Sequence, residues 1–411
     1  MTSIRKVVLA ANGPVYAPQT WSNVPACLLH ALKAKNIEVV TVNLAPLRVL
    51  KALYLICSYG RRRRYPDSSF DYFRSSIHQA YVRLKLKVVT WALHDHVPLI
   101  VLSFSFPLRT GTRPSVLISD WTYEHYIREH LCRRPDVLES RAIATEQRAL
   151  QAADLVVSIF PAIAKGLARS VNRDGVCYLG HGVNHLPDPL ISRQQPRSPN
   201  PVASLRLPLP ANERLSPTSR AKNRRQSGSI LFVGGRRYLE ALQLLLKAFA
   251  VIQKREHAAF TIDVIGFSQA SLMKLGAPPG VVGHGYLDKS CSRDFKAYQD
   301  LFSRASVFVN VSPCWLGFSS MLEALAHGIP AIVAPHPELE HMFPSPAPFL
   351  VHCAYGKGEQ AAVDLSDTIL SVINSSNYES ISLSAQQAAS GYTWDSFVSR
   401  LIARIEALPV T

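Results

Sequence analysis

Short apolar runs rich in β-branched residues alternate with longer amphipathic stretches, and this pattern recurs in both halves of the 411-residue chain. Continuously apolar strands are typical of parallel sheets covered by helices on both faces. We therefore expect an α/β fold of two Rossmann-like, doubly wound domains facing across a cleft. The predicted strands are 6–10, 38–42, 99–104, 115–119, 154–158, 229–233, 261–265, 280–283, 307–311 and 331–334, and the clearest predicted helices are 26–34, 140–152, 238–253 and 319–327.

Composition narrows the class of protein. The chain is 47% hydrophobic and 18% charged, which excludes a disordered or fibrous protein. Its seven cysteines are scattered singly without a C-x-x-C pair, so we expect neither a zinc ribbon nor a disulfide framework, and a reducing compartment. The apolar run at 7–11 is too short for a signal peptide, and no run reaches membrane-spanning length. We expect a cytoplasmic protein, with a peripheral position on the inner face of the membrane as a further option.

Positive charge is concentrated in the N-terminal half. Residues 1–186 carry 24 Lys and Arg against 12 Asp and Glu, residues 187–228 carry 8 against 2, and residues 229–411 carry 13 against 15. The segment 187–228 is rich in Pro, Ser and Arg and has no sustained hydrophobic period, which predicts an interdomain linker. We therefore expect domains at 1–186 and 229–390, with a closing helix at 391–411 that packs back toward the N-terminal domain.

The first motif with chemical content is FVGGRR at 232–237. A predicted strand runs into Gly234 and Gly235 and then into a helix that begins with Arg236 and Arg237. Glycines let a backbone approach a ligand closely, and a helix start with two arginines suits a diphosphate. The alternative is a tight turn followed by an exposed pair of charges.

The second motif runs from residue 311 to residue 330, where a strand is followed by a loop with Gly317 and then a helix. Ser319 and Ser320 are predicted N-caps, and the backbone amides of residues 319–321 (the last being Met321) are predicted to form an anion site. Glu323 lies one turn into this helix, where its carboxylate is placed to accept hydrogen bonds from two ribose hydroxyls. The alternative is that Glu323 only complements the helix dipole.

Together these motifs form a series whose order resembles the C-terminal domain of GT-B glycosyltransferases of the retaining family 4, also called glycosyl transferases group 1. The matching segments are FVGGRRYLEALQLLLKAFAVIQ, DVIG, PPGVVGHGYLDKS, FSRASVFVNVSP and LEALAHGIPAIVA. GHGVN at 180–184 and the closing GYTWDSFVSRLIARIE also fit. The resemblance covers most of the chain except the linker and roughly residues 45–95.

The resemblance implies a hexosyltransferase-like enzyme that moves a sugar from a nucleotide-diphosphate sugar, bound by the C-terminal domain, to a lipid-linked or polysaccharide acceptor on the N-terminal domain. It implies retention and no cofactor. The chain has no Asp-x-Asp motif, so we expect no metal. We predict catalytic roles for Asp120, Arg236 and Arg237. The predicted donor-binding residues are Gly13, Gly234, Gly235, Arg236, Arg237, Gly285, Tyr286, Gly317, Ser319, Ser320, Met321 and Glu323.

Two positions depart from the family pattern. The family has a Glu-x7-Glu signature whose second member matches Glu323, but Trp315 occupies the position of the first, or Leu316 if the alignment shifts by one. Glu240 stands where the family usually has a lysine. An alternative hypothesis is therefore a non-catalytic GT-B-like protein that binds a sugar nucleotide. A GT-B epimerase ranks lower, because its catalytic carboxylates are not recognisable.

Several N-terminal residues have two interpretations each. Gly13 either approaches the donor phosphates or forms a plain turn, and Asp120 either faces a ligand from a strand end or acts as a cap or ion-pair partner. His181 either contacts ligand or packs a loop. His94 and His96 lack a third metal ligand, which favours a solvated loop over a metal site.

The segment 46–64, PLRVLKALYLICSYGRRRR, combines apolar residues of partly helical period with four consecutive arginines. Such a segment fits an anionic membrane surface. The alternative is a core helix followed by a solvated loop. Nucleic-acid binding ranks lowest, because no nucleic-acid-binding motif accompanies the arginines.

Overall fold

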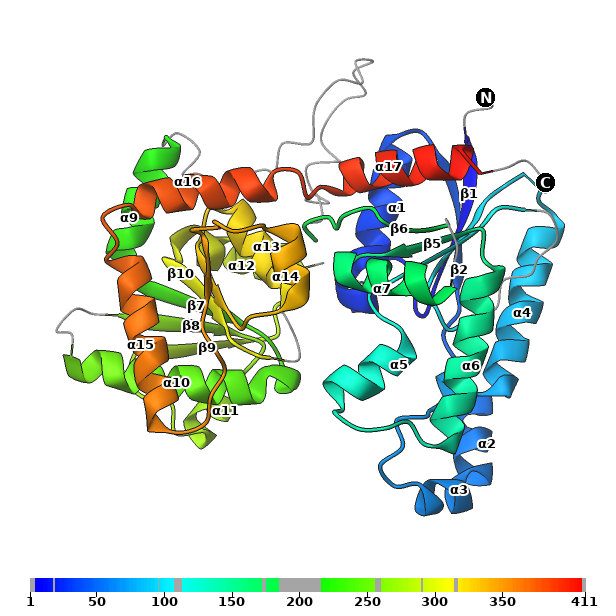
Figure 1. Cartoon of the computed structure of the whole chain (residues 1–411), viewed down its shortest axis with the longest axis horizontal. Helices are drawn as coiled ribbons and strands as arrows, with labels where there is room; N and C mark the ends of the chain where they lie inside the picture. The colour runs from blue at the N-terminus through cyan, green and yellow to red at the C-terminus, as the bar shows by residue number, and fades with distance from the viewer. Residues whose placement is uncertain are drawn as a thin grey trace. The chain divides into compact units, whose positions relative to one another are not determined.

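The computed structural model describes residues 4–17, 19–94, 96–106, 113–171, 175–184, 216–255, 260–289, 291–313 and 317–408. Trp315, Leu316 and most of the predicted linker lie outside these residues. The chain divides into two compact units (Figure 1). The first comprises residues 1–182 and 392–411, and the second comprises residues 183–391. Each unit is described by itself below.

The first unit is built on a six-stranded parallel sheet in the order β2-β1-β3-β4-β5-β6. Its four central strands are short, mostly apolar and buried, as cover by helices on both faces requires. The strands of the sheet are β1 (Lys6–Ala11), β2 (Glu38–Asn43), β3 (Leu99–Leu102), β4 (Ser115–Ser119), β5 (Leu155–Ser158) and β6 (Val176–Tyr178). Its helices are η1 (Thr20–Asn23), α1 (Val24–Ala34), α2 (Arg48–Cys57), α3 (Tyr59–Arg64), η2 (Tyr72–Arg74), α4 (Ser76–Trp91), α5 (Tyr123–His125), η3 (Tyr126–His130), α6 (Val137–Ala152), α7 (Pro161–Val171) and α17 (Trp394–Glu406).

The second unit has a second six-stranded parallel sheet, in the order β12-β11-β10-β7-β8-β9. Its strands are β7 (Ser229–Val233), β8 (Thr261–Ile265), β9 (Val281–Gly285), β10 (Val307–Asn310), β11 (Ala331–Val333) and β12 (Leu350–His352). Its helices are α9 (Pro217–Ser227), η5 (Arg236–Tyr238), α10 (Leu239–Arg255), α11 (Gln269–Lys274), α12 (Ser292–Arg304), α13 (Phe318–Ala326), α14 (Pro337–Met342), α15 (Glu359–Ile373) and α16 (Tyr378–Ala389).

Helices cover both faces of the second sheet. Buried side chains of α10 and α15 form one core cluster with the strands. On the other face α13 packs against α16, and α9 packs against α12 and α16. Figure 1 shows α10 and α15 on one side of the strands and α12 and α13 on the other. The predicted fold class, two doubly wound parallel α/β domains, is confirmed.

The structure adds elements that the pattern did not predict. β6 and β12 are three-residue strands at sheet edges, too short to give a periodic signal. Helix α9 forms at the end of the segment that the composition assigned to the linker, capped by the Ser216 hydroxyl, which accepts from the Ser219 amide. None of the described helices has the length and apolar character needed to cross a membrane.

The last helix, α17, completes the first unit. It packs on α1, where Asp395 pairs with Lys35 at 2.8 Å. Arg400 Nε donates to the Leu179 carbonyl at 2.8 Å, which joins the helix to the chain just after β6. Gly182 lies against the Trp394 ring, and any larger residue there would collide with it. The C-terminal helix is therefore an integral part of the N-terminal Rossmann-like unit.

A buried carboxylate joins the strands of the second unit. Asp263 on β8 is almost fully buried and accepts hydrogen bonds from Ser229 of β7, His284 of β9 and Arg304 of α12, at 2.9, 2.8 and 2.6 Å. Burial raises the pKa of Asp263, but these donors outweigh burial and leave it below its ordinary value. The charge is therefore stabilised where three neighbouring strands meet.

We expect Asp263→Asn to destabilise the protein by about 3 kcal/mol, because it leaves buried partners of a charge network uncompensated. Asp367→Asn is the matched control, since Asp367 pairs with Arg255 on the surface and exposed pairs contribute at most about 1 kcal/mol. Urea unfolding followed by circular dichroism measures both. Equal effects of the two substitutions would show that the Asp263 network does not stabilise the sheet.

Candidate active site

The strand order of the second sheet reverses between β7 and β10, in the middle of the sheet. β7 and β10 are neighbours, while the chain proceeds from β7 outward to β8 on one side and from β10 outward to β11 on the other. In open α/β sheets, ligands bind outside the carboxyl ends of the strands at such a reversal of order. The loops that leave β7 and β10 are the two motifs predicted from the sequence, and Figure 1 labels both strands in the middle of the sheet.

Close packing shapes the turn after β7. A Cβ on Gly234 would lie 2.6 Å from the Tyr238 ring, and Gly266, at φ +106°, lies directly against the Gly234 carbonyl. The Gly234 amide donates to the Ile265 carbonyl at 3.0 Å. Gly234 is therefore required by the protein's own packing, which is the tight-turn interpretation of this residue.

Gly235 differs from its neighbour. A Cβ built on it meets no atom within 4 Å, and its φ of −94° does not demand glycine. Arg236 and Arg237 follow on the short helix η5 and are exposed. The turn thus presents open space beside one glycine together with two cationic side chains at the start of the helical segment.

The loop after β10 ends in a glycine with left-handed backbone geometry and no room for a side chain. Gly317 has φ +56° and caps helix α13, and a Cβ there would lie 2.6 Å from the Asn310 amide nitrogen. The predicted N-caps Ser319 and Ser320 are wrong, because the helix already begins at Phe318. The Met321 amide donates to the Gly317 carbonyl at 2.9 Å, so the predicted anion site at 319–321 loses that donor. The amides of Ser319 and Ser320 have no acceptor inside the helix, as is general for a first turn.

Two side chains hold these loops against each other. The side-chain nitrogen of Asn310, at the end of β10, donates to the Val233 carbonyl at the end of β7 at 3.4 Å. The side-chain oxygen Oδ1 of Asn310 accepts from the Ser312 amide at 3.3 Å. Tyr238, from the first loop, forms a hydrogen bond with the backbone of Gly317, in the second. Burial raises the pKa of Tyr238, and this bond offsets part of the rise. The two predicted motifs therefore lie together in one site.

Glu323 is 2% exposed, and neighbouring side chains hold its carboxylate. Its carboxylate accepts from Lys289 Nζ at 2.8 and 3.0 Å and from the Tyr298 hydroxyl at 2.8 Å. Lys289 also lies 3.9 Å from the centre of the Tyr298 ring. Burial and the nearby Glu323 raise the pKa of Tyr298 well above its ordinary value, so Tyr298 remains a hydrogen-bond donor at every physiological pH.

Asn184 links this cluster to the first turn of α13. Its side-chain nitrogen donates to the Ser319 hydroxyl at 3.4 Å, and its backbone carbonyl accepts from Lys289 Nζ at 3.4 Å. Asn184 is the last residue of the GHGVN motif and belongs to the second unit.

Sequence reasoning missed Asn310, Tyr238, Lys289 and Tyr298 as site residues. Lys289 lay within a matched segment, PPGVVGHGYLDKS, but its pairing with a residue 34 positions away leaves no local signal.

The remaining predicted residues of this unit lie nearby or outside the cluster. The Gly285 carbonyl accepts from the Gly266 amide at 2.8 Å, so Gly285 supports the strand end that packs on Gly234. Tyr286 is exposed. Glu240, which stands where the family has a lysine, is exposed and accepts from the Tyr355 hydroxyl at 3.0 Å.

In the first unit, Asp120 directly follows β4 and contacts Trp21 in the loop between β1 and α1. Its carboxylate accepts from the Trp21 indole at 3.3 Å and from the Trp121 amide at 2.9 Å. Burial raises the pKa of Asp120 despite these bonds. Gly13 lies in the same loop at φ +144°, where a Cβ would lie 2.7 Å from the Thr20 hydroxyl oxygen. Gly13 therefore has a packing reason for being glycine, and Asp120 is joined to this loop through Trp21.

The three histidines singled out in the sequence contact neighbouring groups of the protein. His181 is 1% exposed, hydrogen-bonds the Gly182 carbonyl through Nδ1, and contacts the Trp394 ring. His94 and His96 stack on each other. Within the described part of the chain, no three His, Cys, Asp or Glu side chains are grouped so as to hold a metal ion.

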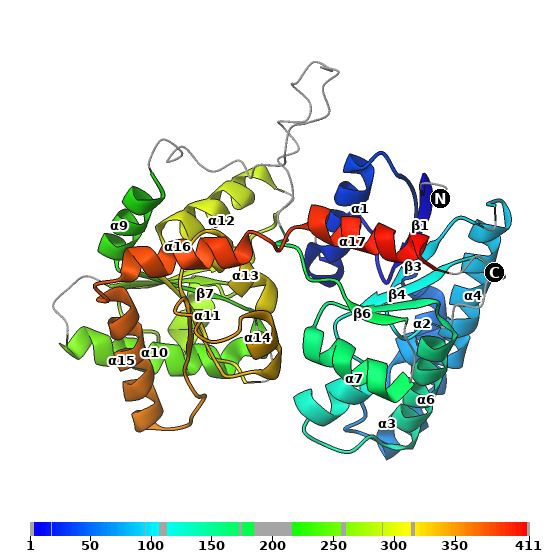
Figure 2. The same ribbon diagram turned by 45° about the horizontal axis from the view of Figure 1, so that its top comes forward.

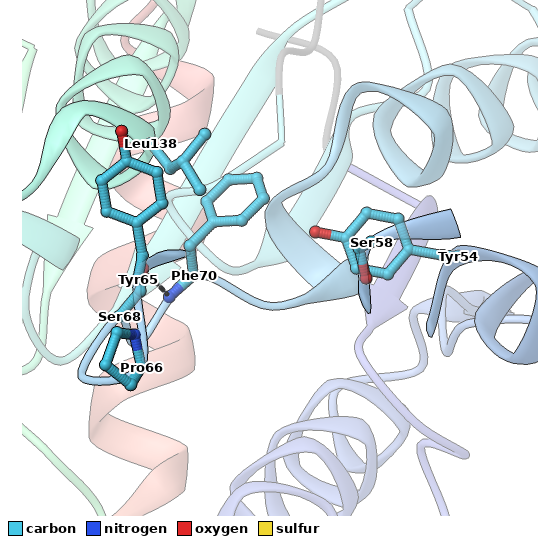
Figure 3. Close-up of a pocket in the computed structure, with 7 residues that line it drawn as sticks. All are labelled: Tyr54, Ser58, Tyr65, Pro66, Ser68, Phe70 and Leu138. Atoms are coloured by element: carbon cyan, nitrogen blue, oxygen red, sulfur yellow. Dashed lines mark hydrogen bonds between the residues drawn. The ribbon is translucent and has the colours of Figure 1, made fainter. Parts of the chain in front are cut away.

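A separate pocket of about 250 Å³ opens in the first unit (Figure 3). None of the predicted site residues lines it. Tyr54 and Ser58 lie on one side of it, and Tyr65, Phe70 and Leu138 lie on the other.

Comparison with known proteins fits this geometry. Residues 227–353 match the family model described as "Glycosyl transferases group 1". Sucrose-phosphate synthase from Thermosynechococcus elongatus has a similar structure, with a TM-score of 0.63, 12% identity, and 98% of this chain and 100% of that chain covered. WaaG, a glycosyltransferase involved in lipopolysaccharide biosynthesis, has a TM-score of 0.62 and 13% identity, with 98% of this chain and 100% of that chain covered. Anabaena HepE, in complex with UDP and glucose, has a TM-score of 0.58 and 14% identity, with the same two shares covered, 98% and 100%. No curated protein sequence matches the chain.

The structural matches establish a GT-B fold. The family model lies on the unit that contains both candidate loops, and with it the protein is a glycosyltransferase by class. The match to the glycosyl transferases group 1 model lies wholly within the second unit.

Burial of His181 predicts a pH dependence of stability. Desolvation lowers its pKa to about 4 in the folded state, against an ordinary value of 6.5. Between these values the unfolded chain binds the proton and the folded chain does not, so stability falls as the pH drops below 6.5. At pH 5 the loss is about 2 kcal/mol relative to pH 7.5. Urea unfolding should show this loss in the wild type and not in His181→Asn, which keeps a donor; an equal loss in both would contradict it.

Proposed function

We propose that this protein transfers a sugar from a nucleotide-diphosphate sugar to a glycan or lipid-linked acceptor, with retention of configuration. The observation that supports this most strongly is the joining of the loops after β7 and β10 by Asn310 and Tyr238. This junction gathers an open glycine, two exposed cations and the start of a nine-residue helix at the strand reversal of the second sheet.

The donor diphosphate is proposed to bind at this junction. Departure of a nucleoside diphosphate concentrates negative charge on its phosphate oxygens, and preorganised dipoles and cations stabilise that charge. The Ser319 and Ser320 amides point their partial positive charge along the helix axis, and Arg236 and Arg237 supply full charges. These groups provide the charge that a metal ion supplies in other transferases, so the proposal includes no metal and no cofactor.

Glu323 is proposed to accept the two ribose hydroxyls of the donor. A carboxylate has about four acceptor positions, and Lys289 and Tyr298 hold three of them. Binding of both ribose hydroxyls therefore requires Lys289 Nζ, which contacts both carboxylate oxygens, to give up one of its two contacts. The Lys289 ammonium lies 2.8 Å from the buried carboxylate, and a nearby positive charge favours the charged form of a carboxyl group. Lys289 and Tyr298 are therefore positioning residues for Glu323.

The first unit is proposed to hold the acceptor. Its excess of basic residues suits a phosphorylated or otherwise anionic acceptor, and residues 46–64 are proposed to contact an anionic membrane surface on the cytoplasmic side. Asp120, with its raised pKa, is proposed to orient the attacking hydroxyl. Retention follows if that hydroxyl attacks the face from which the diphosphate departs, with a phosphate oxygen taking its proton.

A non-catalytic nucleotide-sugar-binding protein is the second candidate. The observation that favours it is the absence of the first glutamate of the family signature. Both candidates require donor binding, and they differ in turnover. Incubation with a panel of UDP-, GDP- and ADP-sugars separates them: release of free sugar or glycosylated product supports the transferase, and tight binding with no release supports the second candidate.

The ribose contact is testable with a double comparison. We expect Glu323→Gln to weaken binding of the preferred nucleoside diphosphate about 10- to 100-fold, since hydrogen bonds to a charged group contribute about 1.5–3 kcal/mol. The 2′,3′-dideoxy form of the same nucleotide lacks both hydroxyls, so its affinity should be equal for wild type and variant. Isothermal titration calorimetry measures all four values. If the substitution weakens both nucleotides equally, Glu323 has no ribose role.

Gly235 provides a steric test of the diphosphate position. We expect Gly235→Ala to leave the melting temperature unchanged, because the added methyl group meets no protein atom, and to weaken nucleoside diphosphate binding at least about tenfold by occupying the space of a phosphate. Gly234→Ala is the contrasting variant, predicted to lower the melting temperature through its collision with Tyr238. Unchanged affinity in Gly235→Ala would place the diphosphate elsewhere.

A further inference from the structure

Helix α2 exposes apolar side chains instead of burying them. Seven of its ten residues are exposed and none is buried. Val49, Leu53 and Ile56 follow the spacing of one helical face and are between 53% and 73% exposed. A helix with this composition normally turns such a stripe toward a core. Here the stripe faces outward.

Helix α4 carries a second exposed apolar stripe. Ile77, Leu84, Val88 and Trp91 recur along one face and are between 53% and 89% exposed. The opposite face packs normally, since Val82 and Leu86 are fully buried in the core of the first unit. The helix is therefore correctly seated, and its outer face is apolar by sequence and not because of a lost contact.

The two helices belong to one region of the first unit. The Tyr72 ring lies 5.2 Å from that of Tyr54 on α2 and 5.3 Å from that of His78 on α4, measured between centroids. Figures 1 and 2 both show α2 beside α4, with α3 continuing from the end of α2. The pocket of Figure 3, lined by Tyr54 and Ser58, lies at the end of α2 and the segment after α3. This region falls within residues 45–95, outside both the family match and the resemblance.

The charged side chains of the three helices in this region are all basic. Helices α2, α3 and α4 contain nine basic residues and no acidic residue: Arg48, Lys51, the four arginines of 61–64, Arg83, Lys85 and Lys87. Arg63 and Arg64 are exposed. We define the docking face as the exposed stripes of α2 and α4 together with the exposed basic residues Arg48, Lys51, Arg63, Arg64, Arg83 and Lys87.

An anionic bilayer fits the chemistry of the docking face better than a second copy of the chain or a nucleic acid does. A second copy of the chain would bring two positively charged surfaces together, which is unfavourable. A nucleic acid would neutralise the arginines but leave valine, leucine and tryptophan in water. An anionic bilayer interface satisfies both, because it attracts the cations and takes up apolar side chains just below its headgroups.

We propose that the docking face binds the surface of an anionic lipid bilayer, with the apolar stripes of both α2 and α4 entering the interface. This deepens the membrane contact of the proposed function by adding α4 as a second anchoring helix. Its test requires no nucleotide and no sugar transfer, so its failure is distinct from a failure of the transferase assignment.

The experiment is co-sedimentation of the full-length protein with phosphatidylcholine vesicles, with and without phosphatidylglycerol. Binding is expected only with the anionic lipid and should weaken as salt rises. The double variant Arg63→Gln/Arg64→Gln should lose at least about tenfold in affinity, since each arginine near such a surface contributes about 1 kcal/mol. The triple variant Leu84→Ser/Val88→Ser/Trp91→Ser should also lose at least about tenfold, since it removes apolar area that enters the interface. Met273→Ser on α11, which removes an equally exposed apolar side chain from the second unit, should bind as the wild type does.

Tryptophan fluorescence supplies a second readout that does not depend on polar substitutions. Anionic vesicles should shift the wild-type emission to the blue, and Trp91→Phe should abolish most of that shift while retaining sedimentation. The proposal is overturned if the triple variant sediments like the wild type, or if no vesicle shifts the emission. It is also overturned if the α4 substitutions instead abolish a dimer detected by light scattering without lipid, or if an oligonucleotide binds to the arginines more tightly than vesicles do.

Discussion

The candidate active site depends on the hydrogen bond between Asn310 and the Val233 carbonyl. Strands β7 and β10 are adjacent in the sheet but separated by more than 70 residues of chain. Their loops therefore need a link of their own beyond the strand ends. Asn310 provides one such link, and Tyr238 provides a second one through the backbone of Gly317. With these links in place, the start of α13 and the arginines of η5 lie on two loops that are joined to each other. Electrostatic stabilisation of a leaving group requires groups that are preorganised in this way.

Glu323 shows how a buried charge can be held ready for a ligand. An isolated carboxylate with 2% exposure would be strongly destabilising. Lys289 and Tyr298 compensate it, and the ring of Tyr298 also stabilises Lys289 through its π face. Asn184 then connects Lys289 to Ser319 at the helix start. One network thus joins the proposed ribose site to the proposed phosphate site, so substitutions at Lys289 should affect both.

The fold could be predicted well from the sequence because buried parallel strands have a strong local pattern, and the ten predicted strands correspond to β1–β5 and β7–β11. The edge strands β6 and β12 were missed because three residues carry no period. The two loops of the candidate site were located from Gly234, Gly235, Gly317 and Glu323. The cap of α13 was misplaced, since serine propensity lost to a glycine at φ +56° packed on Asn310. The partners of Glu323 were not predictable, because they are set by tertiary packing across tens of residues.

The central claim is that a nucleoside diphosphate is held where the loops after β7 and β10 meet. A crystal structure with the preferred nucleoside diphosphate tests it most directly. The account predicts a phosphate oxygen within hydrogen-bond distance of the Ser319 or Ser320 amide, beside Gly235, and ribose hydroxyls on the Glu323 carboxylate. A nucleotide bound away from both loops, with the Glu323 cluster unchanged and untouched, would contradict it.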